Sequence, residues 1–245
     1  MGVFNVYLNK GHERKKEDDV FLKSIARTIA GVIIRKEAEE KINQNYLIQN
    51  VINSILQLSI QFLSLKEYLE KFLELISTVD WLSTKSTGCI FLIGNNSDEL
   101  EMAVHRGLSP RLLNLCRRVR MGSCLCGLSA STGKVIFTSA MDERHEVGYE
   151  GIADHGHYCV PIKVEQRVIG VINLYVEEGH VRTALEEDFL VSAANTLSGI
   201  IERKRMEERL EYMANNDALT GLPNRVLFFD RLAHEIKSST RYGYM

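Results

Sequence analysis

Six cysteine and histidine residues fall within 36 positions of this chain. They are Cys124 and Cys126 in SCLCG, His145 in DERHE, and His155, His157 and Cys159 in DHGHYC. Thiolate and imidazole together are typical ligands of zinc or iron, and four of them close a tetrahedral site. In an extended chain, the two members of a C-x-C or H-x-H pair point to the same face, as chelation requires. We therefore predict that these six residues line one pocket and bind a metal ion, zinc or iron.

Two other interpretations of these residues stay open. Cys124 is able to form a reversible disulfide with Cys126 or Cys159, which would make the pocket a thiol redox sensor. Alternatively, the thiols are packed in the core and the imidazoles are hydrogen-bonded there. Packing roles fit the remaining cysteines, Cys89 in an apolar segment and Cys116 in RLLNLC, so both are left out of the predicted site.

The elements that must position these side chains are a helix followed by short strands. Ser64 and Glu67 match a capping box, and the helix that they open carries one apolar stripe and ends near Asp80. Five β-like segments follow, separated by turn residues, at 89–93, 100–105, 134–138, 158–164 and 167–176. A long helix comes next. This order predicts an α+β domain in which helices cover an antiparallel sheet.

Two segments of this region, GSCLCGLSASTGKVIF and YCVPIKVEQRVIGVINLYV, resemble the signature elements of the GAF domain family. Five residues occupy the positions that the family pattern requires: Gly122, Gly127, Gly133, Pro161 and Gly170. The resemblance implies a GAF/PAS-like sheet with a pocket that senses a small molecule, a metal or iron cofactor, or redox state. Many members of the family act mainly as dimerisation scaffolds, and some are free-methionine sulfoxide reductases that use cysteines of the domain.

Part of this region occurs twice in the chain. Residues 2–41 align without gaps onto residues 170–209, and 18 of the 40 pairs are identical. The second copy follows a complete domain, whereas the first has no domain body before it. We therefore expect residues 1–42 to be the last strand and exit helix of a preceding, truncated GAF domain. The charged helical junctions between repeated sensory domains favour pairing across a homodimer.

The end of the chain carries a different motif, NNDALTGLPNRVLFFDRLAHEI. It resembles the opening of a GGDEF domain, the catalytic domain of diguanylate cyclases, at Asp217, Thr220, Gly221, Asn224 and Arg225. The GG(D/E)EF turn lies beyond this sequence, so the resemblance places the Mg²⁺ and GTP sites in a missing part of the domain. We expect this chain to have no catalytic residues and to make no cyclic di-GMP, and the parent protein to be a diguanylate cyclase.

We thus expect five segments: 1–42, a connecting helix at 43–63, a GAF domain at 64–188, a signalling helix at 189–216 and the GGDEF start at 217–245. The predicted role is regulatory, with a signal passing from the GAF pocket through a dimeric helix to the cyclase domain. A ligand-free scaffold and a thiol redox enzyme of the methionine sulfoxide reductase type are the alternatives. The net charge of −2 gives no general attraction to nucleic acid, and no apolar run is long enough to cross a membrane, so we expect a cytoplasmic protein.

Overall fold

The computed structural model describes residues 3, 5–7, 15–77, 79, 82, 84–94, 98–148, 152–217 and 219–242. The chain divides into two units, residues 1–51 and residues 52–245. The first unit holds most of helix α1 (Lys16–Ser59). The second holds the sheet, its covering helices and the C-terminal helix α6 (Arg225–Tyr242).

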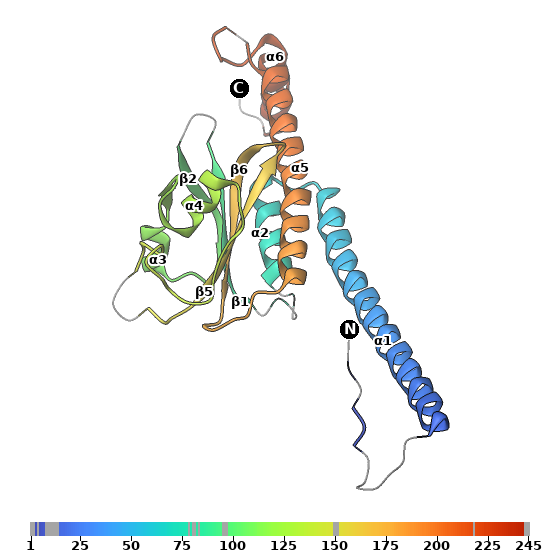
Figure 1. Ribbon diagram of the computed structural model, residues 1–245. Helices are drawn as coiled ribbons and strands as arrows, with labels where there is room; N and C mark the ends of the chain where they lie inside the picture. The colour runs from blue at the N-terminus through green and yellow to red at the C-terminus, as the bar shows by residue number, and fades with distance from the viewer. Residues whose placement is uncertain are drawn as a thin grey trace. The chain divides into compact units, whose positions relative to one another are not determined.

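The second unit is built on a six-stranded antiparallel sheet of strand order β3-β2-β1-β6-β5-β4. The strands are β1 (Thr84–Ile93), β2 (Glu99–Arg106), β3 (Arg118–Arg120), β4 (Ile136–Thr138), β5 (Gly156–Val164) and β6 (Arg167–Val176). Helices α2 (Leu65–Ser77) and α5 (Ala184–Asn215) cover one face, and α3 (Pro110–Leu115) and α4 (Cys124–Thr132) lie on the other (Figure 1). The predicted α+β fold with helices on an antiparallel sheet is confirmed.

The helical face of the sheet forms a hydrophobic core. Phe72 and Ile76 of α2 and Phe189 and Leu197 of α5 are fully buried. The predicted capping box opens α2: the Ser64 hydroxyl accepts from the Glu67 amide at 3.3 Å, and the Glu67 carboxylate accepts from the Ser64 amide at 2.8 Å. Local sequence therefore sets where this helix begins, and burial of its apolar stripe holds it on the sheet.

All five predicted strands are present, as β1, β2, β4, β5 and β6. The short strand β3 and the short helix α3 were not predicted. Ser109 caps α3 by accepting from the Leu112 amide, and Pro110 occupies its first turn.

The prediction that the C-x-C pair is extended is wrong, because both cysteines belong to helix α4. Ser123 occupies the N-cap position, and Gly133 ends the helix in the left-handed region with φ 63°. A Cβ on Gly127 would lie 2.1 Å from the Arg120 carbonyl oxygen, so the helix packs closely on the strand before it. Because residues two apart on a helix differ by about 200° in direction, Cys124 and Cys126 do not face one way as a chelating pair in a strand would.

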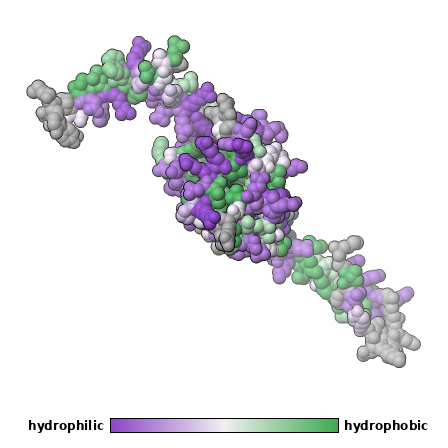
Figure 2. Space-filling view, turned by 90° about the vertical axis from the view of Figure 1, so that its left-hand side faces the viewer, coloured by the Kyte–Doolittle hydropathy of each residue, from purple (hydrophilic) through white to green (hydrophobic). Residues whose placement is uncertain are grey.

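Helix α1 runs without a break from Lys16 through the predicted connecting segment 43–63 as far as Ser59. The predicted final strand of a preceding domain lies largely outside the described residues, and the described part, residues 3 and 5–7, forms no strand. The surfaces of α1 and α6 both carry hydrophobic side chains (Figure 2). Among the described residues, no helix is both long and apolar enough to span a membrane.

Candidate functional site

The site is built on the face of the sheet opposite α2 and α5, at strands β5, β6 and β1. Antiparallel pairing places Asn173 of β6 between Cys159 of β5 and Cys89 of β1. Two residues further along β6, Tyr175 is paired with His157. Because alternate residues of a strand share a face, the sheet presents the thiols, the amide, the imidazole and the phenol together.

Three histidines meet above this floor. The ring centroids of His155 and His157 are 4.7 Å apart, those of His145 and His157 are 4.9 Å apart, and those of His145 and His155 are 5.4 Å apart. One nitrogen from each ring lies within 4.8 Å of the other two. The Tyr175 ring stacks on His155 with a centroid distance of 4.9 Å. The fold thus brings His145, His155 and His157 within reach of one bound ion.

Hydrogen bonds fix the orientation of two of these rings. Nδ1 of His155 donates to the Ala153 carbonyl at 2.7 Å, and Nδ1 of His157 donates to Oδ1 of Asn173 at 2.9 Å. Since both partners are acceptors, the Nδ1 atoms hold the protons and each Nε2 presents a lone pair. Nε2 of both rings is buried, as is Nδ1 of His145, and within the described part of the chain none of the three nitrogens has a hydrogen-bond partner.

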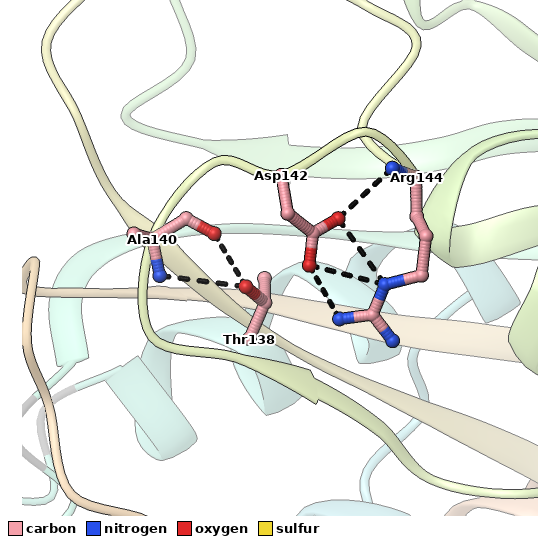
Figure 3. Close-up of polar contacts among 4 residues, drawn as sticks. All are labelled: Thr138, Ala140, Asp142 and Arg144. Carbon is pink, nitrogen blue, oxygen red and sulfur yellow. Dashed lines mark hydrogen bonds and ion pairs between the residues drawn. The ribbon is translucent and has the colours of Figure 1, made fainter.

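The connection between β4 and β5 supplies His145, and hydrogen bonds shape it locally (Figure 3). Asp142 accepts from the Arg144 amide at 2.9 Å and pairs with its guanidinium, while the Thr138 hydroxyl donates to the Ala140 carbonyl. The bond to Arg144 is the main cause that lowers the pKa of Asp142 to about 2. The His145 amide donates to the Asp142 carbonyl at 2.9 Å, and the His145 ring stacks on His157 of β5.

The cysteines lie beside the histidines. Cys126 and Cys159 are buried with their Sγ atoms 3.7 Å apart. Cys124, at the first turn of α4, lines a small cavity together with Cys126, Cys89 and Cys116. All five thiols of the chain therefore gather at this site, including the two that sequence analysis left out.

Asn173 connects the histidines to the cysteines by hydrogen bonds. Its Oδ1 accepts from Cys159 at 3.6 Å as well as from His157, and its Nδ2 donates to Cys89 at 3.8 Å. Neither Asn173 nor Tyr175 was among the predicted site residues. One signal was available in the repeat, because Asn5 and Tyr7 of the first copy are identical to Asn173 and Tyr175.

Burial disfavours the charged forms of several side chains at this site. It lowers the pKa of His157 to about 3 and also lowers that of His145, to which the neighbouring His155 contributes. Burial raises the pKa of Cys116 to about 12 and raises the pKa of Cys89, Cys124 and Cys159 as well. At neutral pH the imidazoles of His145 and His157 are therefore free bases, and these four cysteines are thiols rather than nucleophilic thiolates.

The cavity is also small. It encloses about 20 Å³, which is enough for one water-sized molecule, and His145 and His157 form part of its wall. In this form it fits an ion or a very small ligand rather than a nucleotide.

A family model for the GAF domain matches residues 63–202, more than half of the chain. The chain belongs to the GAF domain family. The GAF domain thus comprises the sheet, α2, the site and the first part of α5. No curated protein matches the chain.

Solved GAF domains share this fold at low sequence identity. The GAF domain of a phosphoenolpyruvate-protein phosphotransferase from Coxiella burnetii is 19% identical, with a TM-score of 0.58, over 66% of this chain and 96% of its own. The corresponding Acinetobacter domain is 17% identical, with a TM-score of 0.54, over 66% and 95%. Free methionine-R-sulfoxide reductase from Neisseria meningitidis is 18% identical, with a TM-score of 0.54, over 65% and 91%. At these identities the likeness shows the fold alone.

Proposed function

We propose that this chain is the sensory part of a cyclic di-GMP signalling protein. In this proposal the GAF domain binds its signal at the histidine and cysteine site. Helix α5 carries the resulting change to a diguanylate cyclase domain that begins at residue 217.

The observation that carries the proposal is how β5 joins the site to α5. His157 and Cys159 face the site, and Tyr158 between them faces the helices. The Tyr158 hydroxyl donates to the Glu186 carboxylate at 3.0 Å. Glu186 also caps α5, because it accepts from the Thr183 amide and pairs with His180. A ligand that shifts β5 at His157 therefore moves the first turn of the exit helix directly.

The far end of α5 has the pattern of a dimer seam. Ile201 is the last buried residue of the helix, and Met206, Leu210 and Met213 are more than half exposed. Their spacing of four and then three residues is that of the a and d positions of a coiled coil. We propose that a second copy of the chain covers this seam in a parallel homodimer, which would let the two output domains meet.

The motif after α5 forms a compact turn. Oδ1 of Asp217 accepts from the amides of Leu219 and Thr220, and Oδ1 of Asn224 accepts from the first amides of α6. The residues that resemble a GGDEF opening thus turn the chain between two helices. Phe228, Leu232 and Ile236 then form an exposed stripe on α6. We propose that the body of the cyclase domain covers this stripe and supplies the Mg²⁺ and GTP sites.

The N-terminal segment also has an exposed apolar face that another domain would cover. The α1 residues that correspond to the buried face of α5 are largely exposed. We propose that residues 1–42 end a preceding GAF domain, whose sheet would cover this face, and that the helix at 43–63 connects the two domains.

The test is cyclic di-GMP synthesis from GTP and Mg²⁺. We expect none from the 245-residue chain and synthesis from the complete gene product. In that product, Tyr158→Phe removes the hydroxyl that joins β5 to α5, so it should change the basal rate or its response to ligand. Lys134→Gln, at an exposed position between α4 and β4, is the control. Absence of synthesis by the complete product, or an unchanged rate and response in Tyr158→Phe, would contradict the proposal.

A thiol redox switch is a second candidate, favoured by the 3.7 Å separation of the Cys126 and Cys159 Sγ atoms. Closing this gap to the roughly 2.05 Å of a disulfide needs only a small shift of α4 on the sheet. The raised pKa of Cys159 opposes it, since a thiolate is the reactive form. Mass analysis after mild peroxide treatment tests this candidate. A Cys126–Cys159 disulfide formed at low peroxide concentration supports the switch, and fully reduced thiols exclude it.

A further inference from the structure

We propose that His145, His155 and His157 bind one divalent transition-metal ion, zinc or ferrous iron, through three imidazole nitrogens. The proposal deepens the proposed function, on which its regulatory meaning rests, by naming the ligand of the sensory site. The binding itself rests on the geometry of the three rings.

The first support is the set of ring nitrogens without partners. Buried polar atoms are nearly always hydrogen-bonded, and leaving one without a partner costs about 1–3 kcal/mol. Three such nitrogens lie together here, on side chains of which His155 and His157 are 5% and 2% exposed. A shared ion between the rings would satisfy all three.

The second support is the way in which the rings are held. A metal-binding histidine usually donates its other N–H to a carbonyl or carboxylate, which fixes the ring and makes the ligand nitrogen more basic. His155 donates to the Ala153 carbonyl and His157 to the Asn173 side chain. Both Nε2 atoms are therefore left with a free lone pair, on rings whose centroids are 4.7 Å apart.

The distances need only a small adjustment. With zinc-to-nitrogen bonds of about 2.0–2.1 Å, neighbouring ligand atoms lie roughly 3–4 Å apart. One nitrogen of each ring is already within 4.8 Å of a nitrogen of the other two rings. His145 lies on the connection before β5, whereas His157 is fixed in the sheet, so we expect His145 to move toward the other two when the ion binds.

The donor set also selects the kind of ion. Neutral imidazoles suit zinc, iron, copper and nickel, whereas calcium and magnesium prefer oxygen ligands. Three protein ligands leave a fourth coordination position open. His145 and His157 form part of the wall of the thiol-lined cavity, so this position faces a space large enough for one water-sized molecule.

The cysteines are not part of the proposed ligand set, although sequence analysis counted three of them. Among the described residues, the group that lies within reach of one ion contains the three histidines and no thiol. Sγ of Cys159 instead contacts Cys126 and Asn173. The thiols thus surround the site rather than complete it.

Binding is tested with the 245-residue chain after removal of metal by a chelator. Titration with Zn²⁺ should give one equivalent bound, and Co²⁺ should give visible d–d bands without the near-ultraviolet absorption of a thiolate–cobalt bond. His145→Gln and His157→Gln should each weaken binding by about 100-fold or more. Zn²⁺ should raise the thermal midpoint of the native chain but not that of these variants.

The matched control is His105→Gln, on an exposed position of β2, and Cys126→Ser tests whether a thiol supplies a ligand. Both should bind one equivalent with affinity within about threefold of the native chain. His145 lies on a partly exposed connection, so its variant is expected to fold even if the His157 variant does not. No binding by the native chain, full binding by His145→Gln, or loss of binding in Cys126→Ser would each overturn the proposal.

These results separate the site from the signalling proposal. Metal binding with no effect on cyclic di-GMP synthesis by the complete gene product would leave the site intact and remove its regulatory role. If cyclic di-GMP synthesis is still regulated in His145→Gln, the signalling proposal stands and the signal is a ligand other than this metal ion.

Discussion

The two copies of the repeat each form a long helix, α1 in the first copy and α5 in the second. Helix α5 buries its apolar face, whereas α1 exposes the corresponding face. The first residue of α5, Ala184, is aligned by the repeat with the first residue of α1, Lys16. Three apolar residues of α5 have no exposed surface: Phe189, Leu197 and Ile201. Their equivalents in α1 are 65%, 39% and 51% exposed: Phe21, Ile29 and Ile33.

This difference separates two determinants of helix structure that usually act together, the local sequence and the burial of the helix against a sheet. Local sequence decides that both segments are helical and where each begins. Burial depends on the sheet next to the helix, which α5 has in β5 and its neighbours. The exposed face of α1 is visible as hydrophobic side chains on the helical surface (Figure 2). Because burial of apolar surface supplies most of the stability of a helix in a protein, equivalent substitutions in the two copies should have unequal costs.

The largest inequality is expected at the aligned phenylalanines. Phe189→Ala removes a fully buried ring and should lower the free energy of unfolding by about 3–5 kcal/mol. Phe21→Ala changes an exposed position and should cost less than about 0.5 kcal/mol. Guanidinium unfolding followed by circular dichroism measures both. Similar costs at the two positions would mean that something covers the α1 face in solution.

A smaller inequality is expected at the helix caps. Glu186 accepts hydrogen bonds from Tyr158 and the Thr183 amide, and it is buried. Glu186→Ala leaves these donors without an acceptor and should cost about 1–3 kcal/mol. The aligned residue Asp18 accepts from the Lys15 amide at an exposed site, so Asp18→Ala should cost less than about 0.5 kcal/mol.

The same unfolding experiment gives both values, with Glu186→Gln as a check on the mechanism. Glutamine keeps an acceptor oxygen and should recover part of the loss. If Glu186→Gln and Glu186→Ala were equally destabilising, the charge of Glu186 opposite His180 rather than its hydrogen bonds would hold the cap.

The strands and the first cap could be predicted because their signals are local. Alternation and turn residues mark β5 and β6, and the Ser64–Glu67 pair marks the start of α2. The prediction for the C-x-C segment was wrong because its structure depends on contacts that are not local. A short run of small and apolar residues fits a strand or a helix equally, and the close packing of Gly127 on the Arg120 carbonyl, a tertiary contact, decides for the helix.

In the site, too, some features have local sequence signals and others depend on tertiary structure. The clustering of His155 and His157 at the start of β5 was visible in the sequence, because alternate residues of an extended chain share a face. The central role of Asn173 depends on the register of three strands, which places it between Cys89 and Cys159. Residue spacing along the chain does not contain that register. The repeat does hold a trace of it, since it preserves the asparagine and the tyrosine of the site floor in both copies.

The smallest expected effect, of opposite sign, is at the aligned glycines. Gly199 of α5 and Gly31 of α1 both lie inside helices, and a Cβ added at either would meet no described atom within 4 Å. Alanine is favoured over glycine in a helix interior by about 0.5–1 kcal/mol. Gly199→Ala should therefore raise the free energy of unfolding of the GAF domain by about that amount.

Gly31→Ala should increase the helix content of α1 without moving the unfolding midpoint of the domain, since residues 1–51 form a separate unit. Circular dichroism and the chemical unfolding midpoint report the two quantities independently. An equal shift of the midpoint by Gly31→Ala would show that α1 unfolds together with the domain. A loss of stability in Gly199→Ala would show that another chain packs closely against α5 at this glycine, and the dimer contact would then begin before the Met206 seam.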